Sequence, residues 1–332
     1  MPILPGKTIG ILGGGQLGRM FAIAARRMGY YVHAFDPTRY GPTGQIADVE
    51  VNAAYDDLTA ARRFAQGVDI VTFEFENVPS ETLAEIEKIV PVHPSPHVLD
   101  TCRHRLHEKE FLSQNGFPVA PFRKVASANE LRLAIAELGT PCILKTAEFG
   151  YDGKGQTTIH SPDQADEAWG NLKAPLGVLE GFIQFEREIS VIGARGQDGV
   201  FYYYPPFENA HRNHILDVTT SPAQISDRVD DRAAEIAIGI AQKIDLIGLI
   251  CVEMFVVNDD VIVNELAPRP HNSGHLTVDA CVTSQFEQQL RAICGLPMGN
   301  PSIIVEAAAM ANLLGDIWSN GEPKWANALA NP

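Results

Sequence analysis

Short apolar runs alternate with amphipathic helical patterns through about the first hundred residues of the chain. The apolar runs read TIGILG, YVHAFDP, DIVTFEF and VPVHPS, and the helical patterns cover residues 16–28, 57–65 and 80–89. Such alternation is typical of parallel βαβ units, because each crossover helix returns the chain to the same end of a sheet. We therefore predict an α/β first domain over residues 1–102, built on a doubly wound parallel sheet.

The pattern changes after this first domain. The strands VAPFRKV and PCILKTA flank a helix that Ser127 and Glu130 are spaced to cap. Longer apolar strands follow, with the sequences REISVIGAR, GLICVEMFVV and DVIVNELA. Helical patterns in this part of the chain cover residues 103–114, 228–243 and 279–294. This mixture predicts an α+β second domain over residues 103–296.

Two further boundaries follow from the same pattern. A small lobe is expected at about residues 120–183, because the glycine-rich segment EFGYDGKGQ separates its strands as a loop. Residues 297–332 are expected to begin a C-terminal domain that is incomplete in this chain.

Composition and charge narrow the class of protein. Hydrophobic residues make up 45% of the chain, charged residues 20%, and the formal net charge is −15. There is no Lys/Arg run that could follow a nucleic-acid backbone, so we expect no nucleic-acid partner. The five cysteines are scattered and never spaced C-x-x-C, which favours free thiols in a reducing compartment.

The apolar runs do not predict a membrane protein. The longest lies near LIGLICVEMFVV, is interrupted by Glu253, and is too short to span a bilayer. The N-terminus has no charged region ahead of an apolar run, so no secretory signal is expected. We therefore expect a cytoplasmic protein without a membrane partner.

The segment GGGQLG has the G-x-G-x-x-G spacing at Gly13, Gly15 and Gly18, between a predicted strand and a predicted helix. This arrangement binds dinucleotides in many oxidoreductases, and Asp36 follows at about the distance of a ribose-binding acid. The backbone N–H groups of such a loop can also meet another anion. Both interpretations stay open on this motif alone.

The most informative pair of charged residues is Glu253 and Glu265, because each lies within an apolar strand. The segment Asn258 to Asp260 has the composition of a hairpin turn, and folding about Asp259 places the two glutamates opposite each other. Facing carboxylates repel, and a divalent cation such as Mg²⁺ would remove this conflict. Alternatively, one glutamate lies at a solvated sheet edge and the other pairs with an arginine.

Other polar residues cluster near predicted strand ends. Lys145 ends the strand CILK just before the glycine-rich loop, where an ammonium group could contact phosphate and Lys154 could add charge. Glu74 and Glu76 lie at the carboxyl end of a predicted parallel strand, where ligands of open α/β sheets bind. For Glu74, capping of a helix N-terminus is the simpler explanation.

The segment LAPRPHNSGH after Glu265 is rich in groups that bind small anions, including Arg269 and His271. His271 and His275 stand four residues apart, as a zinc pair on a helix would. However, the neighbouring Pro270 and Gly274 favour a loop, so zinc is disfavoured.

Together, these motifs resemble one known family. GGGQLGRM, FEFENVPS, GYDGKGQ, FEREISV, YPPFENAHRNHIL and NELAPRPHNSGHLTVDACVTSQFE are similar to motifs of the N5-carboxyaminoimidazole ribonucleotide synthetases, members of the ATP-grasp superfamily. The resemblance runs from about residue 7 to about residue 300. It implies a pre-ATP-grasp domain, a two-lobed ATP-grasp domain and a homodimer.

The resemblance also implies a reaction. ATP phosphorylates bicarbonate to carboxyphosphate, which carboxylates the amine of 5-aminoimidazole ribonucleotide and leaves ADP and phosphate. Mg²⁺ would be the metal cofactor, with Mn²⁺ as an alternative. We expect a ligase of purine biosynthesis whose glycine loop faces the ribonucleotide rather than NAD.

Site residues are implied by the matching positions. For ATP these are Arg105, Lys145, Gly150, Tyr151, Asp152, Gly153, Lys154, Gly155, Gln156, Glu180, Gly181, Phe182, Ile183, Glu188, His211, Asn264 and Glu265. For the metal they are Glu253 and Glu265. For catalysis they are Glu76, Tyr151, Lys154, Arg269 and His271, and for substrate Gly15, Gln16, Leu17, Glu76, Asn272 and Ser273.

Two departures from the family pattern bear on this expectation. Ala267 stands where many ATP-grasp enzymes have an asparagine, so a second metal would be held less well. The family's GRKMGH-like C-terminal motif is absent, and the chain would then bind its substrate more weakly. The alternatives are a related ATP-grasp ligase that uses formate, a biotin-carboxylase-like protein, an NAD-dependent oxidoreductase, or an inactive nucleotide-binding protein.

Overall fold

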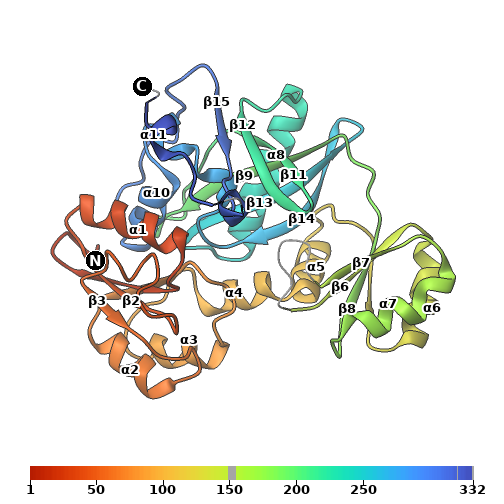
Figure 1. The fold of residues 1–332 in the computed structure, drawn as a ribbon, viewed down its shortest axis with the longest axis horizontal. Coiled ribbons are helices and arrows are strands. Elements are labelled where there is room, and N and C mark those ends of the chain that lie inside the picture. Colours follow the sequence, from red (N-terminus) through yellow and green to blue (C-terminus); the bar gives the residue numbers. More distant parts are fainter. Residues whose placement is uncertain (149–154, 320, 331–332) are drawn as a thin grey trace.

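The computed structural model describes residues 1–148, 155–319 and 321–330, and its strands form three sheets (Figure 1). The first sheet is parallel, as predicted, with the order β3-β2-β1-β4. Its strands are β1 (Thr8–Leu12), β2 (Tyr31–Phe35), β3 (Val49–Val51) and β4 (Ile70–Phe73). The fourth predicted strand, VPVHPS, is wrong: only Val92 bridges to Val71, because the prolines on either side have no N–H to extend the ladder.

Helices cover both faces of this sheet, which confirms the doubly wound arrangement. On one face α2 (Leu58–Gln66) and α3 (Ser80–Glu87) bury Phe64 and Leu83 against Phe35 and Phe73. On the other face lie α1 (Gln16–Arg27) and a helix from much later in the chain, α10 (Gln285–Ile293). The N-terminal sheet therefore completes its core with a distant segment of sequence.

The helix predicted over residues 103–114 is α5 (Arg105–Gln114), and a separate helix, α4 (Pro96–Arg103), precedes it. The break is at His104, whose backbone is extended, and its side chain caps α5. Helix α4 was not predicted, because its start at Ser95 and Pro96 reads as a loop. Ser95 is its N-cap and Pro96 occupies the first turn, where a missing N–H costs nothing. Both helices lie between the N-terminal domain and the small lobe (Figure 1).

The small lobe is an antiparallel sheet with two helices, as expected of an α+β unit. Its strands run in the order β5-β8-β6-β7. They are β5 (Phe122–Val125), β6 (Cys142–Thr146), β7 (Gln156–Ile159) and β8 (Gly177–Gly181), with α6 (Ala128–Leu138), η1 (Pro162–Gln164) and α7 (Ala165–Leu172). Ser127 caps α6 by accepting the Glu130 N–H, while the Glu130 carboxylate accepts from Ala126.

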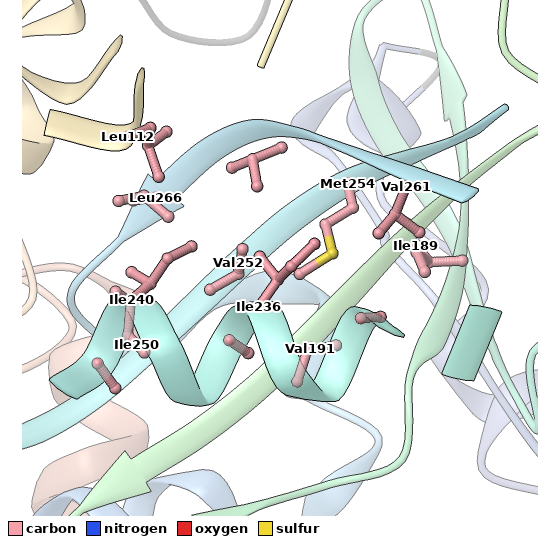
Figure 2. Close-up of a cluster of buried hydrophobic side chains, with 14 of the residues drawn as sticks. Leu112, Ile189, Val191, Ile236, Ile240, Ile250, Val252, Met254, Val261 and Leu266 are labelled. Atoms are coloured by element: carbon pink, nitrogen blue, oxygen red, sulfur yellow. The ribbon is translucent and has the colours of Figure 1, made fainter. Parts of the chain in front are cut away.

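The third sheet is larger and antiparallel, with the order β14-β13-β9-β11-β12-β15 and β10 beside β9. Its strands are β9 (Arg187–Arg195), β10 (Phe201–Tyr203), β11 (Phe207–Arg212), β12 (Ile215–Ser221), β13 (Gly248–Val257), β14 (Asp260–Ala267) and β15 (Ala308–Ala311). Helix α8 (Asp227–Lys243) covers one face. Figure 2 shows its Ile236 and Ile240 packed against Ile250, Val252 and Met254 of β13. This apolar layer supports the strands that carry the polar site.

The helix predicted over residues 279–294 is also interrupted. A short helix, α9 (Thr277–Ala280), follows η2 (Asn272–Gly274), and Ser284 then caps α10 by accepting the Glu287 N–H. Residues after 296 add β15 to the large sheet and then form η3 (Gly315–Trp318) and α11 (Trp325–Ala328). All five cysteines are buried and free, as expected. Within the described residues, no helix is long and apolar enough to cross a membrane.

Candidate active site

A cavity of about 450 Å³ opens where the N-terminal domain meets the small lobe and the large sheet. Its lining comes from segments far apart in sequence: Glu74 and Glu76 after β4, Arg105 at the start of α5, Glu265 on β14, and Arg269 beyond it. The tertiary fold therefore brings together residues that the sequence placed in separate motifs.

An ion pair joins the two domains at this cavity. Arg269 Nε lies 2.8 Å from Glu76 Oε1. Burial raises the pKa of Glu76, and the charge of Arg269 only partly offsets that effect. A carboxylate held away from water in this way is suited to orient a cationic group or to exchange a proton.

The predicted pairing of Glu253 with Glu265 is confirmed. The two residues are partners in the β13–β14 ladder. The turn consists of Asn258 and Asp259, both with positive φ, so it is a two-residue hairpin turn. Continued without interruption, this register would pair Glu253 with Asn264. A bulge at Asn264 shifts the ladder by one residue and brings Glu265 opposite Glu253.

The surroundings of the two glutamates differ. Glu253 lies 3.3 Å from His271 Nε2, and burial together with the charge of Glu265 raises the pKa of Glu253 to about 7. Glu265 has a side chain that is 44% exposed and lies 3.8 Å from Arg105. Both features of the alternative interpretation, exposure to solvent and pairing with an arginine, therefore apply to Glu265 alone.

The pair nevertheless fits a hard cation. No cluster of three or more histidine, cysteine or acidic side chains that could hold a metal occurs in the described part of the chain. Mg²⁺ commonly takes one or two carboxylates and completes its shell with water and substrate phosphates. Burial and the charge of Glu265 raise the pKa of Glu253, and a cation between the two carboxylates would relieve their repulsion.

Cations surround one buried carboxylate beside the cavity. Lys145 Nζ donates to Glu180 at 3.0 Å, while Lys109 and Arg105 lie 3.7 and 3.9 Å from the same group. Burial would raise the pKa of Glu180, but the three cations outweigh it and lower that pKa to about 2. The excess positive charge suits a phosphate chain. Among the described residues, none accepts from the buried Nε–H of Arg105, so this donor could serve a phosphate oxygen.

Lys109 is the residue of this cluster that sequence analysis missed. Its side chain is fully buried, and its Nζ donates to the backbone carbonyl of Asn264, the bulge residue, at 2.7 Å. No motif marked it, because a lysine in an amphipathic helix is ordinarily solvated. Its neighbour Glu108 is also buried and accepts the Leu266 N–H.

The remaining residues predicted to bind ATP lie in three described places and one segment that the structure does not describe. Glu188 and His211 lie in contact at 2.5 Å and line a second, small pocket together with Asn264 and Glu253. At the end of β8, Gly181 and Ile183 are half-buried and Phe182 is exposed. Gln156 begins β7, and Gly155 directly precedes it. Residues 150–154, which include Tyr151, Asp152 and Lys154, lie outside the described residues.

The glycine loop differs from expectation. The Gly14 N–H donates to Asp36, and the Gly15 N–H donates to Glu74, each at 2.7 Å. A Cβ at Gly13 would lie 2.5 Å from the Glu74 side chain, so the glycines make room for the chain's own carboxylates. In this structure the Gly14 and Gly15 N–H groups are occupied by these carboxylates, and contact of the loop with substrate stays a prediction. Asp36 is likewise occupied, which argues against a dinucleotide ribose here.

The predicted substrate residues near the glycine loop and after β14 differ in whether they reach the cavity. Leu17 and Asn272 line the cavity. Gln16, exposed at the start of α1, is not among the lining residues. Ser273 is fully buried and bonds His271, so it does not reach the cavity as a substrate ligand would. His271 directs Nε2 at Glu253.

Comparisons with known proteins agree with this architecture. The ribonucleotide synthetase preATP-grasp domain matches residues 6–103, and the ATP-grasp domain matches residues 110–286. N5-carboxyaminoimidazole ribonucleotide synthase of Bacillus subtilis is 43% identical over 315 residues, which are 95% of this chain and 83% of the relative. The synthase of Brucella melitensis is 42% identical, over 94% of this chain and 87% of the relative.

Solved structures give the same result. An N5-carboxyaminoimidazole ribonucleotide synthetase crystallised with ADP superposes with a TM-score of 0.92 at 44% identity, covering 96% of this chain and 84% of the other. The Aspergillus clavatus enzyme in complex with ADP and 5-aminoimidazole ribonucleotide gives 0.87 at 32% identity, over 93% and 82%. This chain belongs to the N5-carboxyaminoimidazole ribonucleotide synthase family of ATP-grasp enzymes.

Proposed function

We propose that this chain carboxylates 5-aminoimidazole ribonucleotide to N5-carboxyaminoimidazole ribonucleotide, using ATP and bicarbonate and releasing ADP and phosphate. The observation that carries the proposal is the single cavity shared by the cations Arg105 and Arg269 with the acids Glu76 and Glu265. Oppositely charged groups at one site suit a reaction in which anionic ATP and bicarbonate react with each other, and the carboxyl group then passes to an amine while phosphate leaves. The relatives that carry this name match nearly the whole chain.

The nucleotide end of the site is assigned to Lys145, Arg105 and the end of β8. Their positive charge would hold the phosphates, and the exposed Phe182 offers an apolar contact. Glu253 and Glu265 would hold Mg²⁺ between them, with Mn²⁺ as an alternative. When bound, the metal would neutralise charge on the transferred phosphoryl group.

The acceptor end is assigned to Glu76, Arg269 and Asn272. Arg269 is held by Glu76, so its remaining N–H groups can stabilise negative charge that develops on carboxyphosphate. Tyr151 and Lys154 lie outside the described residues, and their catalytic roles stay predictions. The homodimer and the cytoplasmic location also stay predictions.

The decisive experiment measures ADP release from Mg²⁺-ATP, with bicarbonate and 5-aminoimidazole ribonucleotide added separately and together. We expect release that requires both small substrates. Release with formate in place of bicarbonate would instead identify a formate-using ligase. ATP binding without any release would identify an inactive nucleotide-binding protein, and quenching of NADH fluorescence at the glycine loop would favour an oxidoreductase.

A further inference from the structure

Buried polar side chains form one continuous hydrogen-bonded series through the large sheet. Thr219 Oγ1 lies 2.9 Å from Asn209 Oδ1, and Asn209 Nδ2 lies 3.0 Å from Ser190 Oγ. Ser190 Oγ lies 2.9 Å from Ser273 Oγ, which lies 2.9 Å from His271 Nδ1. The other ring nitrogen of His271 faces Glu253 at 3.3 Å.

The series crosses several elements that are not adjacent in sequence. Thr219 is on β12, Asn209 on β11, Ser190 on β9, and Ser273 in η2. All four side chains are buried, with Thr219, Ser190 and Ser273 wholly inaccessible. Polar groups placed so far from water carry a free-energy cost unless each finds a partner. The apolar core is therefore interrupted along this line by groups that satisfy one another.

A single backbone group sets the direction of every hydrogen bond in the series. The Ser273 N–H donates to His271 Nδ1, and a backbone N–H can only donate. Nδ1 therefore carries no proton, and a neutral His271 has its proton on Nε2. The Ser273 hydroxyl must then donate to Nδ1, which leaves its oxygen to accept from Ser190.

The same argument fixes the direction of the hydrogen bonds at the Thr219 end of the series. Ser190 donates to Ser273, so its oxygen accepts from the Asn209 amide nitrogen, and this fixes which way the amide points. The Asn209 oxygen is then free to accept from the Thr219 hydroxyl. Every donor in the series points toward Glu253.

We infer that Thr219, Asn209, Ser190 and Ser273 are positioning residues that hold His271 as its Nε2–H tautomer and aim that N–H at Glu253. One carboxylate oxygen of Glu253 is thereby fixed. Partners of this kind orient the groups that bind a ligand or metal. The inference rests on the proposed function only where it treats Glu253 as a metal ligand.

The tautomer can be observed without substrate, metal or turnover. Long-range ¹H–¹⁵N spectra of the full chain labelled at histidine nitrogen separate a bare ring nitrogen from a protonated one. The His271 signals are identified by their loss in His271→Gln. We expect a bare Nδ1 and a protonated Nε2. A protonated Nδ1 in the unmodified protein, in either the neutral or the charged form, would overturn the inference.

Substitutions test whether a change at the Thr219 end of the series alters the protonation of His271 at the other end. Thr219→Val removes the most distant hydroxyl at nearly constant volume, and we expect it to shift the His271 Nδ1 signal, with a larger shift in Ser190→Ala. Thr219→Ser keeps the hydroxyl and should restore the original spectrum. The matched control is Ser221→Ala, because Ser221 is a buried hydroxyl on the same strand for which the described part of the chain offers no hydrogen-bond partner. If Ser221→Ala and Thr219→Val shift the His271 Nδ1 signal equally, the hydrogen-bonded series does not connect Thr219 with His271.

A kinetic measurement connects the series with the proposed reaction. Ser190→Ala is expected to raise the Mg²⁺ concentration for half-maximal ADP release about 10-fold, with the KM for 5-aminoimidazole ribonucleotide unchanged. A raised KM with an unchanged Mg²⁺ requirement would contradict the assignment to Glu253. If the unmodified chain shows no turnover, the proposed function fails, while the spectra still decide the tautomer.

Discussion

At the scale of residues, the pKa values of buried acids record how well each charge is compensated. Glu180 has three cations around it and a pKa lowered to about 2, whereas burial and the facing carboxylate of Glu265 raise the pKa of Glu253 to about 7. The charge of Glu180 is held by cations within the protein. Glu253 faces a second carboxylate, and we assign the metal to this pair.

Removing one metal ligand should abolish turnover without unfolding the protein. Glu265→Gln keeps the size of a half-exposed side chain but removes the charge, so we expect Mg²⁺-dependent ADP release to fall at least about 100-fold. The melting temperature should change little. Glu137→Gln, on the exposed face of α6, is the control for charge removal. Unchanged activity in Glu265→Gln would remove the metal assignment.

Glu108 should make stability depend on pH. Its burial and the nearby Glu265 raise its pKa, although Lys109 partly offsets them, so the native state keeps a proton that the unfolded state has released. Stability therefore falls as pH rises from the ordinary glutamate pKa through the raised one. In Glu108→Gln this loss is absent.

We expect urea unfolding to show that Glu108→Gln is more stable than the original by roughly 1 to 2 kcal/mol at pH 9, with the difference vanishing near pH 5. Exposed Glu137→Gln provides the comparison. A constant difference across this pH range would show that Glu108 keeps its ordinary pKa.

At the scale of elements, caps and turns decide where the chain changes direction. The β13–β14 hairpin has a turn that the composition NDD predicts, but its register at the site depends on the bulge at Asn264. The Lys109 ammonium binds the carbonyl of that bulge residue. A helix outside the sheet therefore helps to hold the strand geometry that pairs Glu253 with Glu265.

The cap of α6 offers a test at this scale. Ser127→Ala removes the oxygen that accepts the Glu130 N–H, and we expect a loss of about 1 kcal/mol in the stability of the small lobe. Amide hydrogen exchange along the first turn of α6 measures it. Ser127→Thr retains a capping hydroxyl and should lose much less. Equal protection in all three proteins would contradict the role of the cap.

At the scale of the whole molecule, α10 joins the N-terminal domain to the large sheet. Its Phe286, Leu290 and Ile293 complete the core under β1 and α1. Its Gln289 is buried, accepts the Leu249 N–H of β13 at 2.5 Å, and donates to Thr72 of β4 at 2.8 Å. One side chain thus bonds both sheets behind the cavity.

Gln289→Leu should weaken this junction. It leaves the Leu249 N–H and the Thr72 hydroxyl without partners, so we expect a loss of about 2 to 3 kcal/mol in urea unfolding. ADP release should also fall, because the cavity lies between the joined domains. Exposed Gln114→Leu is the matched control and should stay within about 0.5 kcal/mol. Comparable stability of the two variants would show that the junction does not depend on Gln289.

Sequence analysis succeeded where the signal is local. The alternating first domain, the apolar strands, the cap at Ser127 and the turn at Asn258 and Asp259 all follow from patterns within a few residues. It failed where prolines masked α4, and where residues 281–284 interrupt the helix expected over residues 279–294. In that break Cys281 bridges to Ile303 and the Val282 N–H donates to Ser302, contacts with a distant segment that no local pattern records.

For the candidate site too, some features follow from the sequence and others only from the tertiary structure. The chain's motifs determined the family and most of the charged groups around the cavity, because charged residues within apolar runs stand out in any sequence. Only the tertiary structure decided that Lys109 joins them, that the glycine loop binds Asp36 and Glu74, and that Ser273 supports His271. These roles depend on burial and on partners supplied by other elements. Both are properties of the folded chain rather than of the order of its residues.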